Sequence, residues 1–374
     1  MLKTHLYVGI TLALFAGWSC ESPTDKGSKG DQPAITRGIA VITAPTDYSA
    51  ANIEIIDLDS DNIYKNPISV PLHNDLAVRT FGSDVYILER YDKNNIIRYD
   101  SKAGAVVYQE NLGSGININI QDIAVVSETK AYISCEKDKN LIIFNPQTGK
   151  KISNIDLSAY SAGQASYPFA SSMMVYNNFV YVACQRFTDN GYDSGADPGL
   201  IIVVDSYTDI VVAEITLNKK NPMAMDIFDD RLLVASAGHW SEPSSGGIEM
   251  IDLTSNQNIK IVAEMDGASG IAYISSDKAY VRKGGFDENC IFNYCTKIFS
   301  LDLQTGDVSS HFGYIKDGSG GIVHDGVRVY VGERFPGEAG VVVINPVTNT
   351  RERKIVTSTT IMLPVGLGMI FQNW

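Results

Sequence analysis

The sequence LIIFNPQTGK (residues 141–150) decides the fold, because its pattern occurs seven times along the chain. Each occurrence is a short apolar segment that ends in Asp or Asn and is followed by a polar turn. The residues that end the segments are Asp57, Asp100, Asn145, Asp205, Asp252, Asp302 and Asn345. Successive ones lie 43 to 60 residues apart, which is the length of four short strands with their turns.

The polar turns have the composition of Asx-turns. The side-chain oxygen of Asp or Asn can accept a hydrogen bond from the backbone two residues on, and Gly, Asn or Asp tolerates the left-handed backbone that follows. After each turn comes a β-branched strand, as in KISNIDL (residues 151–157), and later an aromatic-aliphatic strand, as in VYVAC (residues 180–184). We therefore predict an inner, second, third and outer strand in each unit.

The two ends of the chain match different strands of one unit. GIAVIT (residues 38–43) matches a second strand, and LPVGLGMIF (residues 363–371) matches an inner strand. The predicted fold is all-β: a seven-bladed β-propeller of four-stranded antiparallel blades over residues 35–374, closed by terminal strands that share one blade. A β-sandwich would not repeat a four-strand unit, and a solenoid would need distinct caps.

These motifs resemble those of the YncE-like propellers, within the quinoprotein amine dehydrogenase-like superfamily. The resemblance spans nearly all of residues 36 to 371, and NPQTGK followed by VYVAC is its closest match. It implies a fold and no particular chemistry, because one fold hosts many functions.

Residues 1–19 resemble a bacterial lipoprotein signal peptide, with Lys3, an apolar stretch and small residues before Cys20. The resemblance implies that Cys20 is lipidated, although Gly17 stands where a branched apolar residue is usual. An ordinary secretory signal is the alternative. Residues 20–34 are polar and predict a flexible tether. We expect a lipid-anchored protein of the bacterial cell envelope, at the outer membrane.

The net charge of −13 and the pI near 4.8 argue against nucleic-acid binding, which needs a cationic face. Expected partners are therefore a small-molecule ligand or an envelope protein, with the membrane contacted only through the lipid anchor. No cofactor is assigned. The sequence lacks the G-x-S-x-G, H-E-x-x-H and phosphate-loop motifs, so we lean towards a protein that is not an enzyme.

Four cysteines follow the predicted signal peptide. Cys290 and Cys295 lie close together in one loop, so we predict that they form a disulfide in an oxidising compartment. Cys135 and Cys184 occupy equivalent repeat positions, and we expect buried free thiols. A zinc site is the weaker alternative, because no His lies at ligand spacing from either pair.

One face of the predicted propeller carries longer loops, which join second to third strands and outer strands to the next blade. A propeller does not need such loops to fold, so this face is the predicted binding site. Its candidate ligand-binding residues are Arg90, Tyr91, Arg186, Phe187, Tyr192, His239, Trp240, Arg282, Phe286, Arg334 and Phe335. Arginine and aromatic side chains combine apolar area with a polar group. The alternative is that they only pack the loops together.

Two sets of carboxylates are weak candidates for metal binding. Asp189, Asp193 and Asp197 lie in one loop without the spacing of a known calcium motif, so a solvated acidic loop is the alternative. Asp75, Asp122 and Asp226 lie near the predicted central channel, where carboxylates could hold a cation, act as a base or accept backbone hydrogen bonds.

The predicted function is ligand or partner capture by the long-loop face of an envelope propeller. The architecture is similar to that of bacterial surface lipoproteins that capture cobalamin, although no cobalamin-contacting motif is matched. A metal-dependent hydrolase or lactonase with a site in the central channel is one alternative. A protein–protein scaffold is another.

Overall fold

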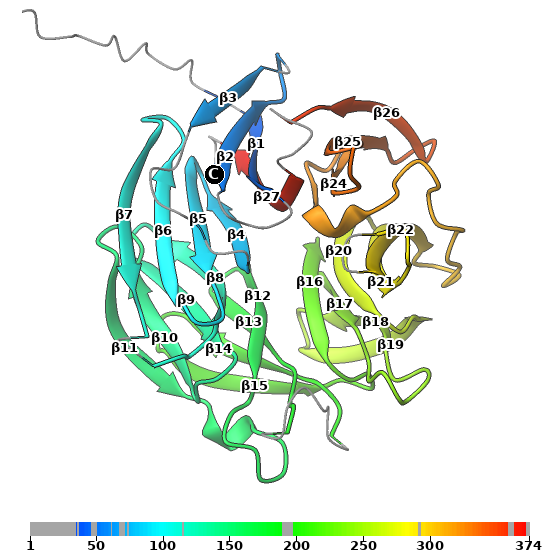
Figure 1. Cartoon of the computed structure of the whole chain (residues 1–374). Helices are drawn as coiled ribbons and strands as arrows, with labels where there is room; N and C mark the ends of the chain where they lie inside the picture. The colour runs from blue at the N-terminus through cyan, green and yellow to red at the C-terminus, as the bar shows by residue number, and fades with distance from the viewer. Residues whose placement is uncertain are drawn as a thin grey trace, which may run out of the picture. The chain divides into compact units, whose positions relative to one another are not determined.

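The two ends of the chain meet in one sheet of the computed structural model. β27 (Leu363–Phe371) pairs antiparallel with β1 (Arg37–Ala44), and Gly38 lies opposite Ile370. The sheet continues with β2 (Asn52–Asp57) and β3 (Ile63–Asn66), and β27 is its innermost strand. Figure 1 shows the red strand β27 beside the blue strand β1. The predicted closure through a shared blade is confirmed.

The structure describes residues 35, 37–45, 51–60, 62–66, 72, 75–113, 116–188, 197–290, 293–357 and 363–371. All of them belong to one compact unit, residues 34–374. The predicted signal peptide, lipidation site Cys20 and tether lie outside the described residues. Within the described ranges, no helix has the length and apolar character that a membrane crossing requires.

Blades 2 to 4 each contain four strands in sequence order, with the first strand innermost. Blade 2 comprises β4 (Leu76–Phe81), β5 (Asp84–Glu89), β6 (Asn95–Asp100) and β7 (Ala105–Asn111). Blade 3 comprises β8 (Ile120–Ser127), β9 (Lys130–Cys135), β10 (Asn140–Asn145) and β11 (Lys150–Asp156). Blade 4 comprises β12 (Ala170–Tyr176), β13 (Phe179–Cys184), β14 (Leu200–Asp205) and β15 (Ile210–Thr216). The short helix η1 (Ser158–Tyr160) joins blades 3 and 4.

Blades 5 and 7 repeat this arrangement, and blade 6 modifies it. Blade 5 comprises β16 (Pro222–Phe228), β17 (Arg231–Ser236), β18 (Gly247–Asp252) and β19 (Gln257–Glu264). Blade 6 comprises β20 (Ala268–Ser275), β21 (Lys278–Phe286) and β22 (Tyr294–Asp302). Blade 7 follows the helix η3 (Gly318–Gly320) and comprises β23 (Ile322–His324), β24 (Val329–Glu333), β25 (Gly340–Asn345) and β26 (Thr350–Ile355).

The outer position of blade 6 holds an irregular segment in place of a regular strand. Val308 forms a single bridge with Leu301. The backbone N–H of Ser309 donates to the carbonyl of Ser300 at 2.9 Å. The seven-bladed, all-β fold is therefore as predicted, and only this outer strand is less regular than its equivalents.

The innermost strands contact one another in a closed circle. The order is β27, β4, β8, β12, β16, β20 and β23, and β23 returns to β27. Apolar clusters fill the spaces between neighbouring blades: Ile42 of blade 1 clusters with Val85 of blade 2, and Val41 of blade 1 with Tyr330 of blade 7. Burial of apolar area at about 25 cal/mol per Å² makes these interfaces the main stabilising contribution.

The repeated Asp and Asn residues form the predicted Asx-turns. The Oδ1 atom of Asn145 accepts hydrogen bonds from the backbone N–H of Gln147 at 2.9 Å and of Thr148 at 3.1 Å. Equivalent bonds occur at the other six residues, Asp57, Asp100, Asp205, Asp252, Asp302 and Asn345. The residue four positions on is left-handed in each turn where the structure describes it, as at Gly149, with a φ of 75°.

A tyrosine on the second strand of several blades bonds to the turn of the next blade. The hydroxyl of Tyr181 in blade 4 donates to Oδ1 of Asn256 in blade 5 at 2.7 Å. Tyr280 in blade 6 likewise donates to Asn349 in blade 7 at 2.5 Å. The acceptors are the left-handed turn residues, so one Asn serves the turn and the interface together.

The strand bounds define two unlike faces. The long-loop face carries the links between blades and the connections from second to third strands. The described residues of these connections are 45, 51, 90–94, 136–139, 185–188, 197–199, 237–246, 287–290, 293 and 334–339. The short-turn face carries the connections from inner to second strands and the Asx-turns. Because innermost strands start at the long-loop face, their first residues surround the ring's centre at that end.

Candidate functional site

A cavity of about 530 Å³ lies at the centre of the ring. Residues of the innermost strands β4, β12, β16, β20, β23 and β27 line it, together with Arg90, Arg282, Ser319 and Gly321 from outside these strands. Its lining includes four methionines, Met174, Met223, Met225 and Met369. Methionine side chains are flexible and polarisable, so they can adapt to an apolar ligand of irregular shape.

Asp122 on β8 holds two blades together. Its carboxylate accepts the backbone N–H of Ile123 at 2.8 Å and that of Met173 in blade 4 at 2.8 Å. Nε of Arg79, which lines the cavity, lies 2.7 Å from Oδ1 of Asp122. This carboxylate is thus engaged by backbone amides and by one cation.

Asp226 on β16 repeats the arrangement two blades further on. Its carboxylate accepts the backbone N–H of Ile227 at 2.9 Å and that of Tyr273 in blade 6 at 2.7 Å. Nε2 of His324, on β23 of blade 7, lies 2.9 Å from Oδ2. The backbone N–H of Gly326 donates to Nδ1 of this histidine at 3.2 Å, so Nε2 carries the proton that Asp226 accepts.

Asp75, the third carboxylate predicted near the channel, is paired with Arg90. Nε of Arg90 donates to Oδ1 of Asp75 at 2.9 Å, and its Nη1 donates to Gln121 at 3.1 Å. The three predicted channel carboxylates therefore contact cations or backbone amides and do not converge on one point.

The described residues contain one group with metal-ligand geometry, formed by Asp287, Cys290 and Cys295. It lies outside the cavity lining, and the two sulfur atoms are joined in a disulfide. The alternative of a metal-dependent hydrolase would need a set of convergent ligands in the central channel. The described residues of the cavity lining contain no such set.

Arg282 differs from the other cavity arginines. It extends from β21 across Gly270 of β20, where an added Cβ would lie 2.8 Å from its Cδ atom. Within the described part of the chain its guanidinium makes no hydrogen bond or ion pair, and its Nε is buried. Burial lowers the pKa of Arg282 to about 10; Asp317 opposes this shift and Arg334 adds to it. The group therefore remains a cation at neutral pH.

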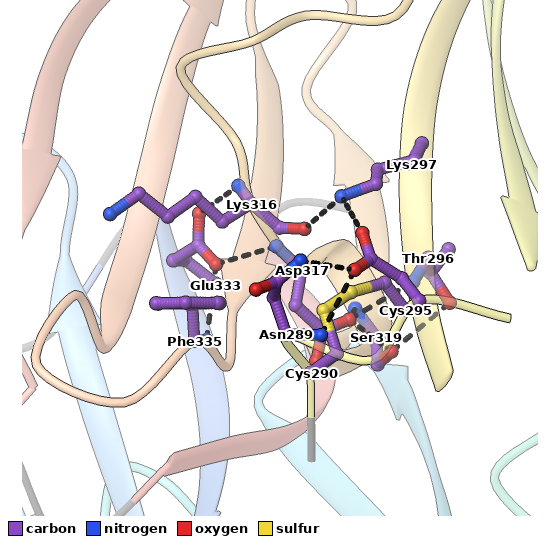
Figure 2. Close-up of a disulfide and its surroundings, with 11 residues drawn as sticks. Asn289, Cys290, Cys295, Thr296, Lys297, Lys316, Asp317, Ser319, Glu333 and Phe335 are labelled. Carbon is purple, nitrogen blue, oxygen red and sulfur yellow. Dashed lines mark hydrogen bonds and ion pairs between the residues drawn. A yellow bond between two sulfur atoms is a disulfide. The ribbon is translucent and has the colours of Figure 1, made fainter. Parts of the chain in front are cut away.

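The disulfide lies beside the hydrogen-bond network of Asp317 (Figure 2). The structure joins Cys290 to Cys295. Oδ1 of Asp317 accepts the backbone N–H of Thr296 at 3.0 Å and that of Ser319 at 3.1 Å. The backbone N–H of Asp317 in turn donates to Glu333 at 2.8 Å. This network fixes the backbone on the blade 6–blade 7 side of the cavity.

Exposed aromatic side chains lie on three blades of the long-loop face. Trp240 is 91% exposed, Phe286 is 81% exposed and Tyr91 is 49% exposed. His239, beside Trp240, has a buried side chain whose Nδ1 lies 2.9 Å from the hydroxyl of Ser241. Among these predicted residues, the three aromatic ones can contact a ligand or partner directly.

Other predicted residues support the loops. Phe187 is 4% exposed and packs edge-on against Phe169 at 5.5 Å between ring centroids. Its ring therefore packs inside the loop, and its role in binding stays a prediction. Nη2 of Arg186 lies 3.4 Å from Oδ2 of Asp197, so these two residues form an ion pair. Tyr192, Asp189 and Asp193 lie outside the described residues.

On blade 7 the two predicted residues lie next to the Asp317 network. The backbone N–H of Arg334 donates to the carbonyl of Asp317 at 2.8 Å. Phe335 is half-buried, and Nζ of Lys316 lies 4.7 Å from its ring centroid.

Cys135 and Cys184 are buried free thiols, and burial raises the pKa of both, which keeps them protonated.

Sequence reasoning missed the methionines, Arg79 and Gly270. The segments MMVY and PMAMDIF (residues 173–176 and 222–228) carry three of the methionines on predicted inner strands. Inner strands of a propeller face the channel, so this pattern could have indicated a cavity lining. Nothing in the sequence shows that Arg282 crosses Gly270, because that contact depends on the pairing register of two strands.

No protein-family model and no curated protein matches the sequence. Solved structures share the seven-bladed propeller fold. Hydrazine synthase from Kuenenia stuttgartiensis has a TM-score of 0.54 and 13% identity, over 75% of this chain and 78% of that one. Apo AztD from Citrobacter koseri has a TM-score of 0.52 and 12% identity, over 90% and 98%. The dihydro-heme d1 dehydrogenase NirN has a TM-score of 0.50 and 16% identity, over 88% and 74%. At these identities the likeness shows the fold alone.

Proposed function

We propose that this protein captures a small-molecule ligand in the central cavity of its propeller, approached from the long-loop face. The observation that carries the proposal is the cavity of about 530 Å³ with Arg282 at its long-loop end. Small-molecule sites are usually concave and combine apolar side chains with a few placed polar groups. Exposed Trp240 and Phe286 on the same face offer further contact area.

A protein–protein scaffold is supported less well. A scaffold would favour a large flat apolar surface without a pocket, whereas the long-loop face surrounds a cavity and carries its exposed aromatic residues on separate blades. The cobalamin capture predicted from architecture is one case of the proposal, and the YncE-like resemblance is compatible with it.

The proposed place of action is the bacterial cell envelope, with Cys20 as the lipid anchor. The apolar N-terminal segment ending at this cysteine supports that placement. The predominantly polar composition of residues 20–34, the predicted tether, agrees with a link between a lipid anchor and the propeller.

Native mass spectrometry of the full chain, purified from a bacterial envelope in mild detergent, tests the proposal. We expect an added mass of a small molecule that leaves on unfolding. The double variant Trp240→Ala/Phe286→Ala should retain less of it. Tyr207→Ala is the matched control, because Tyr207 is 83% exposed on the short-turn face. A wild type that carries no ligand, or equal loss in both variants, would contradict capture from the long-loop face.

A further inference from the structure

The charges that line the cavity are paired, with the exception of Arg282. Arg79 contacts Asp122, Arg90 contacts Asp75, and His324 contacts Asp226. Arg282 has no hydrogen-bonding or ion-pair partner among the described residues. One positive charge is thus left uncompensated in the lining of a protein whose overall charge is −13.

The nearest acid does not neutralise Arg282 by contact. Asp317 accepts hydrogen bonds from the backbone of Thr296 and Ser319 and forms no ion pair with Arg282 within 4 Å. Arg334 lies close enough for its like charge to lower the pKa of Arg282. Arg282, with its buried Nε left without a hydrogen-bond partner, favours a bound anion, because leaving a buried polar donor unpaired is costly.

Gly270 gives Arg282 its path to the cavity. The two residues are paired across β20 and β21, and a Cβ at position 270 would lie 2.8 Å from Cδ and 3.2 Å from Nε of the arginine. Glycine in a strand interior lowers stability and marks a close approach of another group. Because position 270 carries no side chain, the Arg282 side chain has room to cross β20 there.

The rest of the lining combines serines with apolar side chains, among them four methionines. Met174, Met223 and Met225 come from blades 4 and 5, and Met369 comes from β27. Met225 and Met369 also pack into the clusters between blades, whereas Met223 is 39% exposed. An organic anion could cover this exposed thioether, which an inorganic anion could not.

We propose that the cavity binds an organic oxyanion, such as a carboxylate, with its acid group on the guanidinium of Arg282 and its apolar body against the methionines. Arginine presents a planar fork that matches a carboxylate or phosphate with two parallel hydrogen bonds. This inference rests on the proposed function and adds the chemical class of its ligand.

Isothermal titration calorimetry of the full chain with three probes tests it. Naphthalene-2-carboxylate offers an acid and an apolar body, naphthalene-2-carboxamide is its uncharged counterpart, and inorganic phosphate is an anion without the body. We expect the carboxylate to bind at least about tenfold more tightly than either other probe, as a charge-assisted pair implies.

Three variants locate the binding at Arg282. Arg282→Gln removes the cation and should cost at least about tenfold in affinity for the carboxylate, with little effect on the carboxamide. Gly270→Ala keeps the charge but displaces the side chain, so it should weaken the carboxylate as well. Arg351→Gln, at an exposed arginine of β26, is the matched control and should bind as wild type does. Thermal unfolding of each variant checks that it is folded.

Equal binding of the carboxylate and the carboxamide, or carboxylate binding unchanged in Arg282→Gln and Gly270→Ala, would overturn the anion inference. A wild type that binds none of the probes would overturn it too. The proposed function would still stand if native mass spectrometry found an uncharged ligand. It fails separately if the envelope-purified protein carries no ligand at all.

Discussion

His324 is a titratable side chain of the cavity lining. Its hydrogen bond to Asp226 joins blade 7 to blade 5. Burial lowers its pKa, but the hydrogen bond and charge of Asp226, with the charge of Asp325, outweigh this effect and raise the pKa above its usual 6.5. A pKa that is higher in the folded state means that protonation stabilises the fold. This contribution is fully present below about pH 6.5 and is lost as the pH rises through the folded-state value.

We therefore predict that His324→Gln loses more stability in acid than in base. The free energy of unfolding should fall by about 1.5 kcal/mol relative to wild type near pH 5.5, and by less near pH 9. Urea unfolding at both pH values measures the difference. A loss that is equal at both pH values, or larger in base, would show that the pair does not act through protonation.

Asn145 represents the residue that repeats in every blade. Asn145→Ala removes the acceptor for two backbone N–H groups, so we expect a loss of about 1 kcal/mol in the free energy of unfolding. Asn145→Asp keeps the acceptor and serves as the control. Denaturant titration measures the free energy of unfolding of both variants. Equal values for Asn145→Ala and Asn145→Asp would show that the Asx-turn hydrogen bonds do not stabilise the fold.

At the residue scale, local chemistry was predictable from the sequence, but pairing between distant residues was not. The Asx-turn at Asn145 depends on atoms two and three residues away, so its sequence is sufficient. The exposure of Trp240 and the burial of Phe187 depend on how each loop folds over its neighbours. The loop sequences alone do not determine how much of each aromatic side chain is exposed.

At the scale of elements, the strand β27 closes the ring because small residues let it approach blade 2. A Cβ at Gly366 would lie 2.8 Å from Cγ2 of Val78 on β4. The repeat spacing predicted the pairing of β27 with β1, because each end supplies one missing strand of the same unit. It did not predict the irregular outer segment of blade 6, where polar Ser309 and Ser310 interrupt the apolar pattern.

We predict that Gly366→Leu destabilises the protein by about 1–3 kcal/mol, because the larger side chain overpacks the contact that joins the last strand to blade 2. Gly313→Leu is the control, since a side chain at this exposed position meets nothing within 4 Å. Thermal unfolding compares the two. Similar melting temperatures for both variants would mean that the closing strand tolerates displacement.

At the scale of the whole molecule, the proposed function combines the predicted lipid anchor at Cys20 with the central cavity. Cys20→Ser should abolish lipidation, so the variant should leave the membrane fraction and lack the mass of acyl chains. Fractionation and intact-mass measurement test this, with Cys184→Ser, a buried free thiol, as the cysteine control. Membrane association that survives in Cys20→Ser would refute the predicted anchor.

The location of the ligand is the central claim, and a crystal structure of the envelope-purified protein with its retained molecule tests it most directly. We predict density inside the ring, with an oxygen-bearing group within hydrogen-bond distance of the Arg282 guanidinium and apolar atoms against Met223 and Met369. Density bound to the short-turn face or to the outer strands, with the central cavity holding only water, would contradict the claim.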